Sequence, residues 1–541
     1  MQNTHSKNWI GRLLWAAFAS LVLSAAQAAA PGITGPTFNL TAQPAYINQP
    51  DGAQIYSWGY GCNGPPTGFA PAAMTNATCS SMQIPGPTLI VTEGQTVTVT
   101  LTNNLPTAAG DTSILFPGFN VTASGGVAGV LTQEAAPGGT VTYTFVASSP
   151  GTRAYYSGTQ GDLQVEMGLY GAIIVLPANV PAACTSGLHA ANLAAEAHWG
   201  EQDFRLSKAA YDNAKTCYDR EYMFQFAEID PSIHQNALAQ VTALTGCVAG
   251  APGCSLEVPT EPYHPAYFLI NGRSMPDLMD GNYAAEYPHQ PYNGNPHLHP
   301  GEQVLLRIIG QGHWQHPFHE HANHVRILAR DGNLILSDNA GNADPNNLAG
   351  PLLFTTTTTP GLAMDGIFYW TGRGLNWDAY GHNPTSSDPL AKLSCTPDAY
   401  GYNTGFAATD PTYSSPVDTS VWSAVNYYEW CADHNKPLEA TPTGDVPAGG
   451  PATLPYPNIL TNGAWFSGSP YLGPDATTRA TGPNSVFQPA NTQANPANER
   501  GFAFMWHSHN EREITTNNVF PGGMFMMMLV DSREFVIDES K

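Results

Sequence analysis

The fold class of this chain is decided by the stretch Gln95-Thr96-Val97-Thr98-Val99-Thr100-Leu101-Thr102, in which polar and apolar residues alternate. A period of two places every second side chain on one face of an extended chain, which is typical of a half-buried β-strand. A Pro-Gly-Pro turn at 85–87 precedes the stretch, and Asn103-Asn104 ends it. The same criteria predict further strands at 141–146, 170–176, 267–272, 303–309, 324–329, 501–509 and 524–530.

The composition agrees with an all-β chain that is rich in loops. The 541 residues include 53 Gly and 46 Pro, and only 11% of them are charged, while amphipathic helical patterns are few. One helix is predicted near 201–214. We expect a first β-sandwich domain at about 36–180 and a second at about 190–541. The second carries a predicted insertion at about 376–500 that is rich in Pro, Asn, Thr and Gly.

The N-terminus has the pattern of a secretory signal peptide at 1–30. Lys7 and Arg12 stand at the start of a short apolar run that leads into small residues, and cleavage is predicted after Ala28 or Ala30. A membrane anchor is the alternative, but the run is short for a membrane span. We therefore expect an exported protein, periplasmic or extracellular. Cleavage removes two basic and no acidic residues, so the formal net charge falls from −23 to −25, which argues against nucleic acid and membranes as partners.

The number of cysteines predicts disulfides, because it is even and the chain is expected to be exported. All eight lie after the predicted signal peptide, and none lies inside either of the histidine clusters described below, so we expect structural roles for them. Pairing between neighbours in the sequence is the simplest arrangement, although spacing alone does not fix the connectivity: Cys62–Cys79, Cys184–Cys217, Cys247–Cys254 and Cys395–Cys431.

Two histidine clusters carry the chemistry that the sequence predicts. The first is His316-Pro317-Phe318-His319-Glu320-His321, and the second is His507-Ser508-His509. Histidines two residues apart on a strand project from the same face, so each cluster can direct two imidazoles at one point. Neutral imidazole is the commonest metal ligand in proteins and suits copper, zinc, iron and nickel. The two clusters therefore predict a metal site.

The histidine clusters and several other stretches resemble, in the right order, those of the multicopper oxidases, the cupredoxin-domain proteins that include the laccases. The resemblance covers most of 80–375 and 500–530. It rests on Pro85-Gly86-Pro87-Thr88, Phe268-Leu269-Ile270-Asn271-Gly272, the stretch at 301–309, both histidine clusters and Gly522-Gly523-Met524. It implies tandem cupredoxin-like Greek-key β-sandwich domains. It also implies copper as the cofactor, because this family passes electrons from a blue copper to a trinuclear copper cluster that reduces oxygen.

The chain departs from the family pattern at both kinds of copper site. Ser508 stands where the blue copper site has its cysteine, and a hydroxyl is not the soft thiolate that such a site needs. The two histidine pairs that the N-terminal domain of the family gives to the trinuclear cluster are also missing. Their positions hold Leu115, Pro117, Tyr156 and Gly158. Laccase-type reduction of oxygen by four electrons is therefore not expected.

The residues that remain predict a smaller metal centre, in which four histidines could hold one copper ion, or two. Glu513 and Met524 are weaker candidates. Glu513 is equally well explained as a loop charge, and the methionines at 524 and 526–528 are more typical of core, with Met524 the best candidate among them for a ligand. The predicted metal-binding residues, by the family pattern, are His316, His319, His321, His507 and His509.

Other polar residues near these clusters receive a simpler interpretation. His313 and His324 flank the first cluster and are interpreted as structural. Glu320 points to the opposite face of its strand and is interpreted as a hydrogen-bond partner. His297-Leu298-His299 lies in a stretch rich in Pro and Asn and is interpreted as a pair of surface histidines.

Three functions remain open from the sequence. The first is an exported copper-binding oxidoreductase with a reduced, non-blue centre, for which a small molecule or a metal ion is the expected substrate. The second is a copper-binding or copper-sequestering protein without turnover. The third is a secreted structural or interaction protein with a vestigial site. The sequence indicates neither the oligomeric state nor whether a partner supplies the missing ligands.

Overall fold

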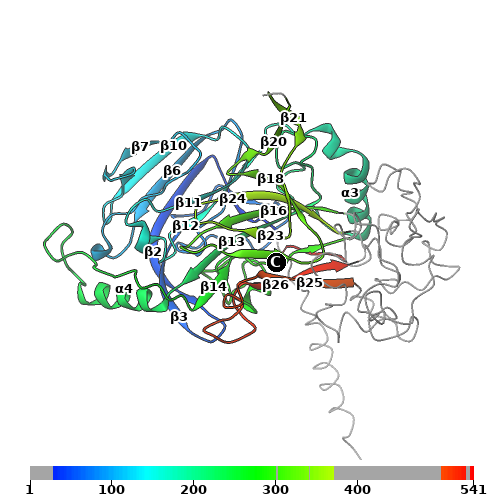
Figure 1. The fold of residues 1–541 in the computed structure, drawn as a ribbon. Helices are drawn as coiled ribbons and strands as arrows, with labels where there is room; N and C mark the ends of the chain where they lie inside the picture. The colour runs from blue at the N-terminus through cyan, green and yellow to red at the C-terminus, as the bar shows by residue number, and fades with distance from the viewer. Residues whose placement is uncertain (1–28, 300–301, 340–341, 371–500, 532–535, 541) are drawn as a thin grey trace, which may run out of the picture.

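The computed structural model describes residues 29–299, 302–339, 342–370, 501–531 and 536–540 (Figure 1). The predicted insertion at 376–500 and nearly all of the predicted signal peptide lie outside the described residues. The described chain consists mostly of β-sheets with few helices, so the predicted all-β class is confirmed.

Two five-stranded sheets make up the N-terminal part, and a short ribbon of β8 (Val127–Ala128) and β9 (Gln133–Glu134) adjoins them. One sheet has the order β11-β12-β5-β1-β4: β1 (Gly32–Thr34), β4 (Phe69–Ala70), β5 (Leu89–Thr92), β11 (Gly151–Tyr156) and β12 (Tyr170–Leu176). The other has the order β3-β2-β6-β10-β7: β2 (Thr37–Asn48), β3 (Gln54–Cys62), β6 (Thr96–Asn103), β7 (Thr122–Gly125) and β10 (Thr140–Val146).

Strand β6 shows why the N-terminal part folds as a sandwich. Val97, Val99 and Leu101 are fully buried, and the threonines between them are partly exposed. The apolar face joins a core cluster that includes Trp58 and Tyr143. Full burial of a Val or Leu side chain contributes roughly 1.5–3 kcal/mol relative to exposure, so this alternation fixes which face of the strand points inward.

The C-terminal part is a second pair of sheets, and the small antiparallel pair of β20 (Leu336–Asn339) and β21 (Asn342–Leu348) adjoins it. The larger sheet has the order β14-β13-β16-β24-β18-β19, with one more strand paired to β18: β13 (Arg220–Ile229), β14 (Tyr267–Ile270), β16 (Gln303–Gly310), β18 (Val325–Arg330), β19 (Asn333–Leu334), β22 (Leu352–Leu353) and β24 (Ala363–Tyr369). The other has the order β15-β26-β25-β17-β23: β15 (His297–Leu298), β17 (Pro317–Glu320), β23 (Thr355–Thr357), β25 (Gly501–Ser508) and β26 (Phe525–Asp531).

Strand β13 is an element that the sequence did not predict. All ten of its residues are buried, including Arg220, Glu221, Gln225 and Glu228. A strand that is covered on both faces shows no alternation between core and solvent, so the period of two gives no signal. Its polar side chains are accommodated by buried hydrogen bonds and ion pairs, and Glu228 proves important below.

The helices are few, and one of them was misplaced by the sequence. The helix predicted near 201–214 is wrong: helix α3 (Gly187–Trp199) ends at Gly200, whose φ of +87° favours glycine and closes the last turn. Helix α4 (Pro231–Ala243) was not predicted, although Asp230 caps it by accepting a hydrogen bond from the Ser232 amide. The short elements are η1 (Thr107–Ala109), α2 (Gly161–Gln164), η2 (Ala182–Thr185) and η3 (Asp277–Met279). None of the helices within the described ranges is both long enough and apolar enough to cross a membrane.

Disulfides form between sequence neighbours, as predicted, in the part of the chain that the structure describes. The bridges are Cys62–Cys79, Cys184–Cys217 and Cys247–Cys254. The predicted fourth pair, Cys395–Cys431, lies outside the described residues. Disulfides persist in oxidising compartments, so the three bridges are consistent with the predicted export.

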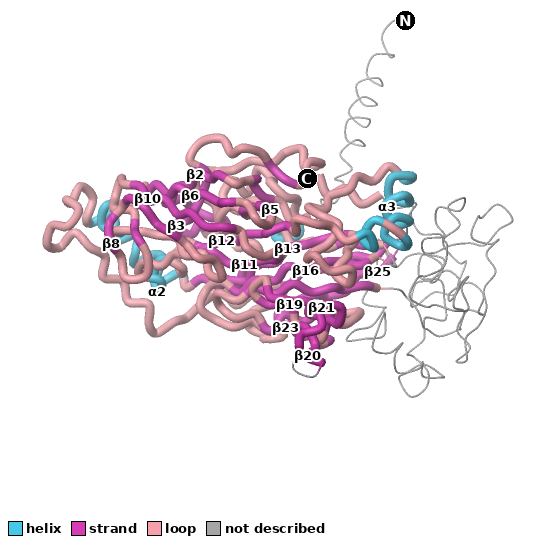
Figure 2. Tube along the Cα trace, turned by 90° about the horizontal axis from the view of Figure 1, so that it is seen from above, coloured by secondary structure: helices cyan, strands magenta, loops and turns pink. Residues whose placement is uncertain are grey.

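The two sandwiches pack against each other along β11 and β24, and helix α3 lies at the end of the described part that is far from β8 and β10 (Figure 2). Asp365 of β24 accepts hydrogen bonds from Thr152 of β11, at 2.6 Å from the hydroxyl and 3.0 Å from the amide. The Tyr211 hydroxyl donates to the same carboxyl group (2.6 Å). This buried polar junction holds residues of the N-terminal and C-terminal parts together.

Candidate metal centre

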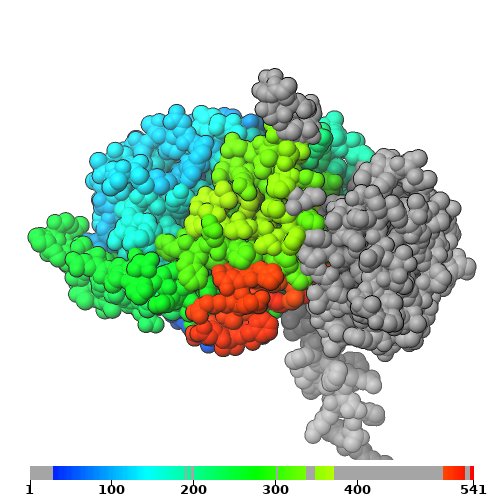
Figure 3. All heavy atoms as spheres, in the orientation of Figure 1, coloured from blue at the N-terminus to red at the C-terminus, as the bar shows by residue number. Residues whose placement is uncertain are grey.

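The two histidine clusters meet because their strands pair. Strands β17 and β25 are antiparallel neighbours, and the register places His319 opposite His507. Side chains two residues apart share a face of a strand, so His321 and His509 extend the same face. Phe318 and Ser508, which are also paired, point to the other face of the sheet. Residues after the second cluster reach the surface of the molecule, where the segment 501–531 is coloured red in Figure 3.

The four histidine rings form one compact cluster. The centroid of the His319 ring lies 4.9 Å from that of His321, 5.6 Å from that of His507 and 4.8 Å from that of His509. The Nε2 atoms of His321 and His507 are 3.3 Å apart. The His509 side chain is 55% exposed, whereas the residues His319 and His507 are each 8% exposed. The cluster is therefore buried on one side and open to solvent at His509.

Hydrogen bonds at the outer nitrogens orient two of these rings. His319 Nδ1 lies 2.8 Å from Thr355 Oγ1, and His507 Nδ1 lies 2.7 Å from the Ser508 carbonyl oxygen. The carbonyl oxygen can only accept, so it fixes the tautomer of His507 with Nε2 as the free electron-pair donor. The Thr355 hydroxyl can accept from His319 Nδ1 in the same way, which is how proteins orient histidines that bind metals. His321 Nδ1 is buried and has no hydrogen-bond partner. The other nitrogen of His321, Nε2, is the atom that faces the His507 ring.

The surroundings keep three of these imidazoles, those of His319, His321 and His507, neutral. Burial first, and then the neighbouring histidines, lower the pKa of His319 to about 4 and that of His321 to about 3. Burial also lowers the pKa of His507. Metal binding requires neutral imidazole, so little competition from protons is expected at neutral pH.

The four side chains fit a copper ion chemically, but as they stand they do not converge on one point. Among the described residues, no group of three or more His, Cys, Asp or Glu side chains is already placed to hold a metal ion. Four imidazole nitrogen donors from two paired strands suit copper better than the hard ions Mg²⁺ and Ca²⁺, which prefer oxygen.

His316 lies in a different environment, although it is only three residues from His319. It is fully buried, with Nε2 2.9 Å from Glu228 Oε2 and Nδ1 2.9 Å from Glu513 Oε2. Burial alone would lower the pKa of this imidazole, but the hydrogen bonds and charges of the two glutamates outweigh burial and raise the pKa to about 9. Both nitrogens are therefore engaged and the ring is held as an imidazolium, so we leave His316 out of the ligand set that we propose.

Glu513 and Ser508 belong to the environment of His316 and not to the four-histidine cluster. Ser508 Oγ donates to Glu513 Oε2 (2.5 Å), and Asn510 Nδ2 donates to Glu513 Oε1 (2.8 Å). Glu513 is fully buried, so it is not the solvated loop charge that was one of the two interpretations of the sequence. Glu228 is the residue that the sequence analysis missed, because its strand gave no alternating signal.

The remaining candidates lie where packing explains them. Met524, which the sequence singled out from the core methionines as a possible ligand, is fully buried in the core cluster of the second sandwich together with Met526 and Met528. Glu320 is buried and accepts a hydrogen bond from Thr356, and burial raises the pKa of its carboxyl group to about 8. The positions where the family has its missing N-terminal histidines lie together, since Leu115 and Tyr156 form a β-bridge.

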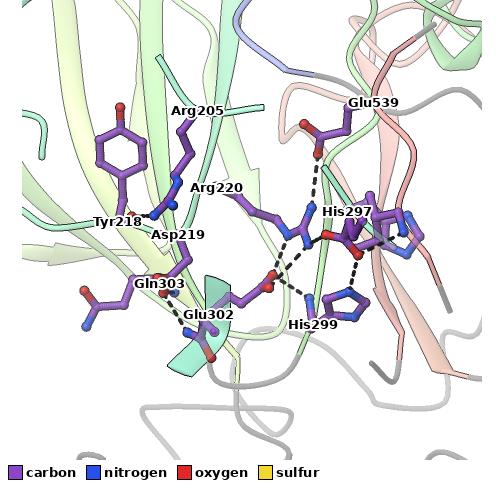
Figure 4. A network of polar contacts seen from close by, with 12 residues as sticks. Arg205, Tyr218, Asp219, Arg220, His297, His299, Glu302, Gln303 and Glu539 are labelled. Carbon is purple, nitrogen blue, oxygen red and sulfur yellow. Dashed lines mark hydrogen bonds and ion pairs between the residues drawn. The ribbon is translucent and has the colours of Figure 1, made fainter. Parts of the chain in front are cut away.

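The interpretation of His297 and His299 as surface residues is wrong, because both are fully buried. Figure 4 shows them in a network around Arg220, whose guanidinium group pairs with Glu201, Glu302 (2.5 Å) and Glu539 (3.5 Å). His299 Nε2 lies 3.0 Å from Glu201 Oε2. Strand β15 pairs with β26, and this pairing places the His-Leu-His stretch in the interior of the sandwich. The Pro-rich sequence around the stretch gave no sign of this burial.

Comparison with known proteins agrees with the resemblance seen in the sequence. Residues 69–180 match the model of a family described as multicopper oxidase. A stretch of 96 residues is 40% identical to an L-ascorbate oxidase of Brassica rapa subsp. pekinensis, and it covers 17% of this chain and 16% of that protein. The predicted resemblance to the multicopper oxidases is thus confirmed for the N-terminal part. The match spans about a sixth of the ascorbate oxidase, so the activity of that protein is not assigned to this chain.

Solved structures with a similar fold include the multicopper oxidase mgLAC and the blue copper oxidase from Nitrosomonas europaea. Each is 15% identical to this chain over 92% of its length, covering 86% and 85% of the respective structures, with TM-scores of 0.42. A structural similarity this weak supports no conclusion about the chemistry of the histidine cluster.

Proposed function

We propose that this chain is an exported copper-binding protein with a reduced, non-blue copper centre, and that it acts as an oxidoreductase. The proposed ligands are the four clustered residues His319, His321, His507 and His509. The single observation that carries the proposal is the gathering of their rings on one face of paired strands, with ring centroids about 5–6 Å apart. The match to a copper-dependent family over residues 69–180 supports copper over the other metals that imidazole suits.

The residues around the cluster have separate roles in this proposal. Thr355 and the carbonyl group of Ser508 hold the Nδ1 atoms of His319 and His507, so their Nε2 atoms are available as ligands. Burial of His319 and His507 limits water on the inner side, while the exposed His509 leaves a side open for a small molecule. Bound copper would supply one-electron chemistry between Cu(I) and Cu(II). The absence of a thiolate at Ser508 is why a blue centre is not proposed.

Copper content is the first test of the proposal. Protein reconstituted with Cu(II) and freed of excess metal is expected to retain copper, and the His507→Ala/His509→Ala variant is expected to lose it. His264→Ala is the matched control, because His264 is an exposed histidine outside the cluster and should leave copper content unchanged. Electron paramagnetic resonance of the retained copper should show nitrogen ligation without the intense colour of a thiolate site. Equal copper in all three proteins would refute the site.

Turnover is the second test, and it separates an enzyme from a copper carrier. Oxygen consumption with a phenolic donor is measured for the copper-loaded protein and for the His507→Ala/His509→Ala variant. A rate that falls to background in the variant supports an oxidoreductase. Equal rates would leave copper binding without turnover as the function of the cluster.

A further inference from the structure

Residues 536–540 form a short tail without helix or strand that is held by buried contacts. The Ile537 side chain is fully buried. The Ser540 carbonyl oxygen accepts a hydrogen bond from the hydroxyl group of Thr75, in the N-terminal part of the chain (3.3 Å). Between these two residues, the side chain of Glu539 is almost completely buried and points into the polar network of Figure 4. The docking of the tail therefore depends on how the carboxyl group of Glu539 is accommodated.

The guanidinium group of Arg220, on β13, is shared among three buried carboxyl groups. It pairs with Glu201, which follows α3, and with Glu302, which precedes β16 (2.5 Å), whereas its contact with Glu539 is longer, at 3.5 Å. The imidazole of His299, next to β15, lies 3.0 Å from Glu201. A carboxylate that is buried without a cation of its own is so costly that the group takes up a proton instead. Glu539 has the longest contact with the guanidinium group, so it is the carboxyl group on which the proton is expected.

The hydroxyl group of Tyr222 gives a second and independent sign that Glu539 carries a proton. The Tyr222 oxygen lies 2.6 Å from Glu539 Oε1 and also contacts the His297 carbonyl oxygen, while the His297 amide donates to it (3.1 Å). A phenol has one hydrogen to donate, and a carbonyl oxygen can only accept. When the hydroxyl group donates to His297, its contact with Glu539 needs a hydrogen from the carboxyl group. A neutral Glu539 that donates to Tyr222 satisfies all of these contacts.

We propose that the tail is a strap locked by acid: residues 536–540 stay docked while Glu539 holds a proton, and they are released when that proton is lost. Tyr222 connects the strap to His297 of β15, which is the edge strand of the sheet that carries the four clustered histidines. Release exposes the Ile537 side chain to solvent and frees the hydroxyl group of Tyr222. The position of the tail is thereby linked to pH.

The direction of the effect follows from the two states of the carboxyl group. Burial raises the pKa of the docked Glu539 to about 8, against the effects of Arg220 and Tyr222, and the charges of Glu201 and Glu302 add to the rise. The released side chain has the ordinary pKa of a glutamate, near 4.5. The free energy of docking is therefore greatest below about pH 4.5 and is lost as the pH rises toward about 8.

Hydrogen–deuterium exchange of the copper-free full-length protein tests the strap. The reporter is the Ile537 amide, which donates to Glu201 Oε2 (3.1 Å) and is protected while the tail is docked. Its protection is measured at pH 5.5 and at pH 8.5, after correction for the pH dependence of chemical exchange. The expected result is protection at least tenfold lower at pH 8.5, while the amides of β6 keep theirs. Equal protection of Ile537 at the two pH values would overturn the proposal.

Variants then identify the group that holds the proton. Glu539→Gln is neutral at both pH values and can donate to Tyr222 from its amide, so the Ile537 amide should stay protected at both. Glu511→Gln is the matched control, because the Glu511 side chain is 75% exposed, and it should respond to pH as the wild type does. A loss of protection in Glu539→Gln, at pH 8.5 alone or at both pH values, would overturn the role of this carboxyl group. The measurement needs no metal, so this proposal and the copper proposal can fail independently.

Discussion

His316 and His319 are three residues apart in one motif, yet their surroundings drive them to opposite states. Two glutamates flank His316 and, against the effect of burial, raise its pKa to about 9, whereas burial and then the neighbouring histidines lower the pKa of His319 to about 4. The comparison teaches that burial alone does not decide the charge of a histidine, because the partners of its two nitrogens do. One imidazole in this motif is held as part of an ion pair, and the other is kept neutral and available to a metal.

The largest effect is expected from removing one carboxyl group of the ion-paired region. Glu513→Gln should lower the free energy of unfolding by about 3 kcal/mol. The substitution leaves the buried imidazolium of His316 with one carboxylate partner in place of two. Urea denaturation of the copper-free protein measures the change. Glu511→Gln is the control, because the Glu511 side chain is 75% exposed and its loss should have little effect. A change below about 1 kcal/mol in Glu513→Gln would show that the pair is not a stabilising element.

The two regions should also differ in how their stability depends on pH. The folded-state pKa of His316 is raised, so its contribution is complete below about pH 6.5 and is lost as the pH rises through about 9. The folded-state pKa of His319 is lowered, so this residue destabilises the fold as the pH falls from about 6.5 through about 4. Unfolding free energies of the copper-free wild type and of His316→Gln and His319→Gln, measured from pH 4 to 10, should show differences at opposite ends of the range. Parallel curves would contradict the comparison.

A smaller effect is expected from the residue that orients His319. Thr355→Val removes the hydroxyl group 2.8 Å from His319 Nδ1 and keeps the shape of the side chain. Loss of an outer hydrogen bond to a metal-binding histidine typically costs 10–100-fold in metal affinity, and we expect about tenfold here. Competition with a copper chelator measures the change. Thr357→Val, in the same strand but exposed, should leave the affinity as it is.

The smallest effect is expected from restoring the cysteine of the family pattern. Ser508→Cys should cost about 1 kcal/mol, through the weaker hydrogen bond from sulfur to Glu513. The new thiol would face Glu513 and His316. Because both nitrogens of His316 remain engaged by glutamates, this histidine cannot join the thiol in binding copper, and the variant should not turn blue. An intense thiolate-to-copper absorption in this variant would show that the ion pair gives way to metal and that the two regions are less distinct than the structure indicates.

The alternation of polar and apolar residues predicted strands that have one buried face. It did not predict a strand that is buried on both faces. The alternation at 95–102 predicted β6, and the spacing of His319, His321, His507 and His509 placed them on one face, as the register of β17 and β25 then showed. Strand β13 gave no periodic signal, so Glu228 was missed. The role of Glu513 depends on which buried group it meets, and the spacing of residues along the chain does not contain that information.

The most direct test of the central claim is the copper content of three proteins prepared in parallel: the wild type, His319→Ala/His321→Ala, and Glu513→Gln. The account predicts that the wild type and Glu513→Gln retain the same copper after removal of excess metal, while His319→Ala/His321→Ala retains none. Full copper in the double histidine variant, or loss of copper in a folded Glu513→Gln protein, would contradict the division between the neutral cluster and the ion-paired histidine.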